Sequence, residues 1–447
     1  MACGIATTLS GKYVDVFLHH FAPHYSHIIP MHHILLIYQW KRLDKLGPWF
    51  EYSSCAQDFA NNVKEFQPTD IVAVDWHGIL AWESILLDIG DVEDDGESSS
   101  ASIWHPNSAN ICYYNFRVYS HSDDDDVRFY REKEQLSCRV ANVILCLSEH
   151  DRGMLQRLIE EDDGNDIAPL TRQQQKPIDE RGDTKTIHIL YPPLRGDIWA
   201  LAAHHNDGDM EYLNQYLPQE AKNAMELIPT ESRTKQLMLI TCCARLSPEK
   251  QPHHFVALLR KLGGEDFLRR NFLIPILCGA RSVEEYAKDV VHDFQDICTV
   301  SSDCETWPCV VINRHLGPKE LAAIYSRTVV NVHPCVYDAY GMTLVESAAF
   351  GVPSIVNHGG QVGAASLLGE GKGCIAVDLE TILELDGVTD DDEQIRILLA
   401  QLDRSQQVDQ VEESTTLRQI AKEAKSQALG YDEMACCQGL LDILNGL

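Results

Sequence analysis

The sequence predicts an α/β protein of two domains, each built on a doubly wound parallel sheet. Short apolar runs rich in β-branched residues alternate with segments of helical periodicity along most of the chain. Such alternation forms a parallel sheet covered by helices on both faces. The 447 residues suffice for two ordinary domains. A polar stretch at 196–234 has helical character and no strand signal, so it separates two strand–helix series.

These observations divide the chain into four parts. We expect an N-terminal domain over 1–195 that carries acidic inserts, a linker over 196–234, a C-terminal domain over 235–410 and a helical segment over 411–447 with a break at Gly430. Two domains that face each other leave a cleft, which is the usual place for a ligand.

The individual elements follow from apolar runs and turn residues. The first series has expected strands at 69–76, 109–116, 140–148 and 186–193. Ser148 is a suitable N-cap for a helix at 150–159. The second series has expected strands at 236–244, 272–280, 309–316, 329–334 and 353–358, with helices at 252–262, 283–295 and 318–328 between them.

The segment from His333 to Gly360 carries the strongest functional signal. A strand ends at Pro334, Gly341 permits a tight turn, and a helix is expected over 342–350. A helix that begins at the carboxyl end of a parallel strand points free N–H groups and a positive dipole at an anion, most often phosphate. Asp338 in the loop and Glu346 one turn inside the helix flank that position. Two carboxylates beside a diphosphate indicate a nucleotide-sugar site; a βαβ unit without a site is the alternative.

This segment resembles the retaining GT-B glycosyltransferases of the glycogen-synthase-like and sucrose-synthase-like group, glycosyltransferase family 4. Their motif E-x-F/Y-G-x-T-x-x-E-A corresponds here to DAYGMTLVES, in which Asp338 replaces the first Glu and Glu346 keeps the second. The resemblance covers 70–360 in pieces and is strongest over 236–360. It implies the GT-B fold: two Rossmann-like domains facing across a cleft, with the C-terminal helical segment packing back toward the first domain.

The resemblance extends to other donor-side residues. Arg245 and Lys250 match the family's R-x-x-x-x-K after the first strand of the second domain, and two such cations suit a diphosphate. With Asp338, they are the expected catalytic residues. The remaining donor-binding residues are Glu346, Gly341, Met342, Thr343 and, at the strand end that lies against the nucleobase, His315. A surface turn with solvated cations and an ordinary strand end are the alternatives.

The first domain matches less well. Asp75, Trp76 and His77 match a family D-W-H stretch, for which a structural role and acceptor contact are both open. Asn115 or Phe116 stands where the family has a His near the transferred sugar. The glycine-rich loop after the family's first strand has no counterpart in the first part of the chain.

The resemblance implies a retaining glycosyltransferase that moves a sugar from a UDP- or GDP-sugar to a hydroxyl acceptor: a glycan, a lipid-linked or a small molecule. The cations and the helix dipole would stabilise the leaving diphosphate, so we expect neither a metal nor a cofactor. Two alternatives stay open. One is a catalytically silent GT-B module that binds a sugar nucleotide or a partner protein, and the other is a sugar phosphorylase.

Composition limits the partners. A formal net charge of −30 argues against nucleic acid and against anionic lipid. The acidic runs at 91–102, 123–126, 160–166 and 390–393 are expected to be solvated loops. The fifteen cysteines form no CxxC pair and are expected to be reduced thiols. No cleavable signal is apparent, and the apolar stretch 28–40 is too short to span a bilayer. We expect a cytoplasmic protein with at most peripheral membrane contact.

Overall fold

A computed structural model gives the fold of this chain. It describes residues 4–7 (backbone), 70–76, 78–80, 82, 109–121, 127–161, 185–203, 210–228, 237–298, 307–359, 361–369, 372–379 and 417–446. The chain forms two compact units, described here separately. Unit 1 comprises Met1–Leu190 and Cys437–Leu447, and unit 2 comprises Tyr191–Cys436.

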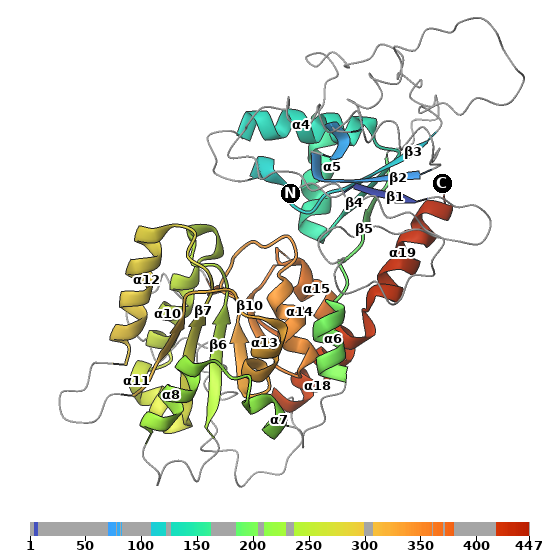
Figure 1. Cartoon of the computed structure of the whole chain (residues 1–447). Coiled ribbons are helices and arrows are strands. Elements are labelled where there is room, and N and C mark those ends of the chain that lie inside the picture. The colour runs from blue at the N-terminus through green and yellow to red at the C-terminus, as the bar shows by residue number, and fades with distance from the viewer. Residues whose placement is uncertain are drawn as a thin grey trace, which may run out of the picture. The chain divides into compact units, whose positions relative to one another are not determined.

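The sheet of unit 1 has the order β1-β2-β3-β4-β5 (Figure 1). Its strands are β1 (Gly4–Thr7), β2 (Asp70–Val74), β3 (Asn110–Tyr114), β4 (Val143–Cys146) and β5 (Ile187–Ile189). The strands β2 to β5 are parallel, whereas β1 pairs with β2 in the antiparallel direction. Because apolar side chains from both faces of a parallel sheet are buried, β4 is buried along its whole length.

Two helices of unit 1 pack on this sheet and against each other: α4 (Val127–Val140) and α5 (Glu149–Glu160), preceded by the short η2 (Tyr119–His121). The Ser148 side chain accepts a hydrogen bond from the Asp151 N–H, which confirms the predicted N-cap of α5. The buried core between helices and sheet is formed by Ile79, Tyr113, Ile144, Leu155 and their neighbours.

The sheet of unit 2 is entirely parallel and has the order β11-β10-β9-β6-β7-β8. Its strands are β6 (Met238–Cys243), β7 (Leu273–Cys278), β8 (Val310–Ile312), β9 (Thr328–Val332), β10 (Ser354–Asn357) and β11 (Cys374–Val377). Along the chain, β7 and β8 are added on one side of β6, and β9 is then added on its other side. The strand order therefore reverses between β6 and β9, and such switch points are where open α/β sheets bind ligands.

The helices of unit 2 form two packed groups (Figure 1). The first contains α10 (Pro252–Lys261), α11 (Gly264–Asn271) and α12 (Glu284–Asp296). The second contains α6 (Gly196–Ala203), α7 (Met210–Asn214), α13 (Pro318–Tyr325), α14 (Met342–Ala349), α15 (Gly363–Leu368) and α18 (Leu417–Gly430). In addition, α8 (Gln219–Leu227) packs on β7 and β8, and the short η3 (Pro248–Lys250) precedes α10. The helix α19 (Glu433–Asn445) follows α18; it begins in unit 2, and its residues from Cys437 onward belong to unit 1.

These elements confirm the predicted strands at 69–76, 109–116, 140–148 and 186–193, and all five of the second series. The break near Gly430 is confirmed, because α18 ends there. The segment after 196 is helical as expected, but α6 is apolar and packs on α13 and α14. The elements β1, β11, α4, α11 and α15 were not predicted from the sequence.

Several predictions lie outside the described residues. These are the acidic runs at 91–102, 123–126 and 390–393, most of 160–166, the apolar stretch 28–40, the missing glycine-rich loop, and helical character at 411–416. Within the described part of the chain, every helix is too short or too polar to cross a membrane. The described cysteines are free thiols.

Candidate functional site

The carboxyl ends of β6 and β9 meet at the switch point of unit 2, and they bring Lys250 and Asp338 together. The Lys250 Nζ lies 2.6 Å from Asp338 Oδ2. Two contacts hold their backbones in place: the Cys335 thiol donates to the Lys250 carbonyl at 3.3 Å, and the Val336 N–H donates to the Gln251 side chain at 2.8 Å. The loop after β6 and the loop after β9 are therefore joined at several points. The Lys250–Asp338 ion pair connects the two strands between which the strand order reverses.

Asp338 is also fixed from a third direction, by the segment that follows β10. Its N–H donates to the Gln361 carbonyl at 3.1 Å, and its own carbonyl accepts from the Gly363 N–H at 3.2 Å. The His333 Nε2 lies 3.3 Å from the same Oδ2 that Lys250 contacts, which is an ion-pair distance without a hydrogen bond. One carboxylate oxygen thus has two basic neighbours.

These neighbours set the charge of both side chains. Burial would raise the pKa of Asp338, but the contact with His333 and the charge of Lys250 outweigh it and hold that pKa well below its usual range. Burial would lower the pKa of His333, but Cys335 and Asp338 raise it to about 9. At neutral pH the site therefore holds an ionised Asp338 between two cations.

Gly341 is the N-cap of α14, a position that cannot accommodate a side chain. Its φ is +84°, in the left-handed region, and a Cβ would lie 2.7 Å from Leu344 Cδ1. The first amides of a helix have no acceptor within the helix, and here they belong to Gly341, Met342 and Thr343. Met342 and Thr343 are half-buried. The beginning of α14 thus supplies the anion-binding geometry expected from the sequence.

Glu346 lies inside α14 and is buried, with 4% of the residue exposed. Its Oε1 accepts from Arg195 Nη1 at 3.2 Å, and Arg195 also pairs with Asp197 at 2.8 Å. Burial raises the pKa of Glu346 to about 7, against the lowering effect of the Arg195 charge. The sequence analysis missed Arg195 because its partner is far away in the chain and no motif contains it.

Arg245 and His315, which were also expected on the donor side, lie away from Asp338 and Glu346. Arg245 follows β6 but forms an exposed ion pair with Glu249. His315 is exposed after β8, the edge strand two positions from β6. Neither has a contact with Asp338 or Glu346 within the described part of the chain.

The described first-unit candidates are hydrogen-bonded or packed within the fold. Asp75, at the end of β2 with φ +53°, accepts from the Phe116 N–H at 2.8 Å. Burial raises the pKa of Asp75 to about 6, against the lowering effect of that hydrogen bond. Asn115 is fully buried and donates to the Tyr113 hydroxyl and the Arg117 carbonyl. Trp76 packs edge-on against Phe129, with ring centroids 5.6 Å apart. His77 lies outside the described residues.

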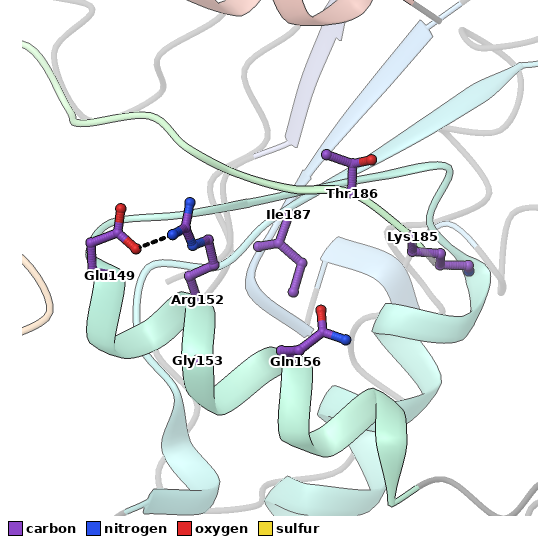
Figure 2. Close-up of a pocket in the computed structure, with 7 residues that line it drawn as sticks. All are labelled: Glu149, Arg152, Gly153, Gln156, Lys185, Thr186 and Ile187. Carbon is purple, nitrogen blue, oxygen red and sulfur yellow. Dashed lines mark ion pairs between the residues drawn. The ribbon is translucent and has the colours of Figure 1, made fainter. Parts of the chain in front are cut away.

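A hollow of about 450 Å³ lies in unit 1 between α5 and the start of β5 (Figure 2). Its charged lining groups already have partners. Arg152 pairs with Glu149, and the Lys185 Nζ donates to carbonyls at the end of α4, including those of Cys138 at 2.8 Å and Ala141 at 2.9 Å. Lysine at a helix C-terminus stabilises it. The hollow contains none of the expected site residues.

Two groups of described residues have donor atoms close enough for a metal ion. The first is His333, Cys335 and Asp338, where Lys250 already supplies a cation to the carboxylate. The second is the exposed group His292, Asp293 and Asp296 on α12. An exposed group of this kind is common on helix surfaces and indicates no site by itself.

Comparison with known proteins supports the fold. No family model matches the sequence, and no curated protein is significantly similar to it. Solved structures do match. A trehalose-6-phosphate synthase from Burkholderia multivorans has a TM-score of 0.59 and 14% identity, covering 91% of this chain and 78% of its own. The trehalose-phosphate synthase (UDP-forming) from Burkholderia xenovorans in complex with glucose-6-phosphate has a TM-score of 0.57 and 15% identity, covering 90% and 79%.

A third structure of this kind, from E. coli and bound with UDP-2-fluoro glucose, has a TM-score of 0.56 and 14% identity, covering 91% of this chain and 80% of its own. The chain therefore has the fold of these synthases, the GT-B fold that the sequence predicts. These neighbours are trehalose-phosphate synthases, so the narrower assignment to glycosyltransferase family 4 stays a prediction.

Proposed function

We propose that the protein is a retaining glycosyltransferase that transfers a sugar from a nucleoside diphosphate sugar to a hydroxyl group. The observation that carries the proposal is the Lys250–Asp338 pair at the β6/β9 switch point, beside the N-terminus of α14. UDP-glucose is the donor to test first and a sugar phosphate the acceptor, because one neighbour is bound with UDP-2-fluoro glucose and another is in complex with glucose-6-phosphate.

Breaking the anomeric C–O bond places negative charge on the leaving diphosphate. Lys250 has three N–H donors at the end of a flexible side chain, so it can bind a phosphate oxygen of the donor. Arg245 pairs with Glu249 at the surface, and exposed pairs of this kind contribute only about 0–1 kcal/mol. Arg245 is therefore readily available to a diphosphate. The free amides at the start of α14 add further donors, and such preorganised donors are what stabilises developing charge.

The two carboxylates suit the uncharged parts of the donor. Lys250 and His333 contact Oδ2 of Asp338, and no described residue is bonded to Oδ1. Arg195 contacts Oε1 of Glu346, and no described residue is bonded to Oε2. Each side chain thus keeps one oxygen to accept from a hydroxyl group. We assign Asp338 to the sugar hydroxyls and Glu346 to the ribose.

The test is UDP-glucose turnover in Lys250→Ala. Loss of one donor to the leaving group should lower kcat/KM at least about tenfold, with the melting temperature close to that of the parent. Lys288→Ala is the matched control, since Lys288 is an exposed lysine on α12. Unchanged kinetics in Lys250→Ala would remove Lys250 from the site. In Asp338→Asn, transfer should fall more than UDP affinity.

A catalytically silent GT-B module is the second candidate, and Asn115 favours it. The family's His position is taken by a fully buried side chain whose amide protons are both bonded to the protein. Such a module would bind UDP-glucose and form no product with sugar phosphates or other hydroxyl acceptors. A phosphorylase would instead transfer the sugar to inorganic phosphate and release a sugar phosphate.

A further inference from the structure

His333 lies where β9 ends, next to the loop that carries Asp338. It is 3% exposed, and its ring carbon Cε1 would be 3.4 Å from a Cβ on Gly341. The ring is therefore enclosed between the strand end and the start of α14. Its Nε2 approaches Asp338 Oδ2 at 3.3 Å from one side, and Lys250 approaches the same oxygen from another.

The two cations are not equivalent. The Lys250 side chain is 22% exposed and carries its charge at the end of a flexible aliphatic chain, whereas the His333 side chain is 3% exposed. A lysine can turn toward a phosphate that arrives from solvent. The enclosed imidazole has no such freedom, because close packing allows it few rotamers. Its contact with Asp338 can therefore persist when a donor diphosphate attracts Lys250.

We infer that His333 is a positioning residue for Asp338: it holds Oδ2 of the carboxylate throughout the reaction, so that Oδ1 is directed to the sugar of the donor. This inference rests on the proposed function and extends it to a residue that no motif contains. The role needs a proton on Nε2: the protonated imidazole always supplies it together with a positive charge, whereas a neutral ring supplies it in only one of its two tautomers and without the charge.

The surroundings of His333 favour the protonated form. The charged or titratable groups that face it in the described part of the chain are Asp338 and Cys335 from its own loop and, across Asp338, Lys250 from η3. Asp338 and Cys335 raise the pKa of His333 to about 9 despite its burial. The raised value means that the contribution of this contact is complete below the ordinary histidine pKa and is lost as the pH rises through about 9.

The experiment compares His333→Gln and His333→Leu with the parent in the full chain. Gln retains a neutral donor and fills most of the same space, so it remains a test if Leu impairs folding. His292→Gln is the control, because His292 is exposed on α12. UDP-glucose affinity, kcat and the pH profile of kcat are measured for each. Histidine NMR of the parent and of Asp338→Asn reports the charge of His333 independently of turnover.

The expected result is a kcat lowered at least about tenfold in both His333 variants, less in Gln than in Leu, with UDP-glucose affinity within about threefold of the parent. The parent's loss of activity near pH 9 should be absent from His333→Gln, and the NMR pKa of His333 should fall in Asp338→Asn. Parent-like kcat and pH profile in His333→Gln would overturn the inference, as would equal losses of affinity and kcat. Absence of turnover in the parent would reject the proposed function instead, and an unchanged His333 pKa in Asp338→Asn would reject the contact itself.

Discussion

At the residue scale, the two acidic side chains of the site share one arrangement. Asp338 and Glu346 each have one oxygen held by a cation, while the other is not bonded to any described residue. Their charges nevertheless differ. Asp338 is ionised throughout the physiological range because its pKa is lowered, whereas the pKa of Glu346 is raised to about 7. The site therefore contains one fixed charge and one that titrates near neutrality.

This difference predicts pH-dependent donor binding. An ionised Glu346 accepts hydrogen bonds from the ribose, so UDP-glucose affinity should weaken as the pH falls through about 7. In Arg195→Gln the lowering effect of the Arg195 charge is lost, so the midpoint should move to higher pH. Calorimetric titration with UDP-glucose between about pH 6 and pH 8.5 measures both, since its diphosphate does not titrate there. Glu346→Gln should show no such dependence; a flat profile in the parent would contradict the role of Glu346.

Local spacing singles out some of the residues proposed for the site but not others. The five-residue step from Arg245 to Lys250 and the eight-residue step from Asp338 to Glu346 are visible in the sequence. His333 stands inside the same segment, yet its role depends on which oxygen it reaches. Arg195 contacts Glu346 across 151 positions, a pairing that packing alone decides.

At the element scale, the start of α14 depends on one glycine. Gly341 has φ +84° and little room for a Cβ, whereas Gly359 has φ +98° with open space around it. Both positions disfavour a side chain through the backbone, but only Gly341 adds a steric clash. A comparison of substitutions at Gly341 and Gly359 therefore separates the cost of backbone strain from the cost of a steric clash.

Gly341→Ala should therefore destabilise the protein more than Gly359→Ala. We expect about 1 kcal/mol for Gly359→Ala from the left-handed backbone alone, and about 2–4 kcal/mol for Gly341→Ala, which must also move Leu344. Denaturant unfolding followed by fluorescence gives the two values, and UDP-glucose affinity should fall only in Gly341→Ala. Equal losses in the two variants would show that the clash is relieved without cost.

The predicted elements succeed where apolar runs are uninterrupted or a turn residue marks their end. β6, β7 and β9 lie in such apolar runs, with Gly279 after β7 and Pro334 after β9, and α10 and α13 begin at a proline in the first turn. β11 (CIAV) was not predicted although it is as long as β4 and β10, because the family resemblance that supported β10 ends at Gly360, before β11 begins. α11 was missed because GEDFLRRN is short and highly charged, with an apolar face of Phe267 and Leu268.

At the scale of the whole molecule, the two units differ in how well they fit the proposed activity. Unit 2 has the strand reversal, the helix N-terminus and the charged groups of a donor site. In unit 1, the expected residues Asp75 and Asn115 are bonded within the fold. The described residues therefore bear more on donor binding than on sugar transfer. An active enzyme and a silent module would differ in sugar transfer.

The most direct test is to incubate the full chain with UDP-glucose and glucose-6-phosphate in the presence of EDTA and to follow the anomeric proton by NMR. We expect release of UDP together with a product that keeps the α configuration of the donor, at a rate that EDTA does not change. Binding of UDP-glucose without any product, across a panel of sugar phosphates and other hydroxyl acceptors, would contradict this expectation and identify a silent module.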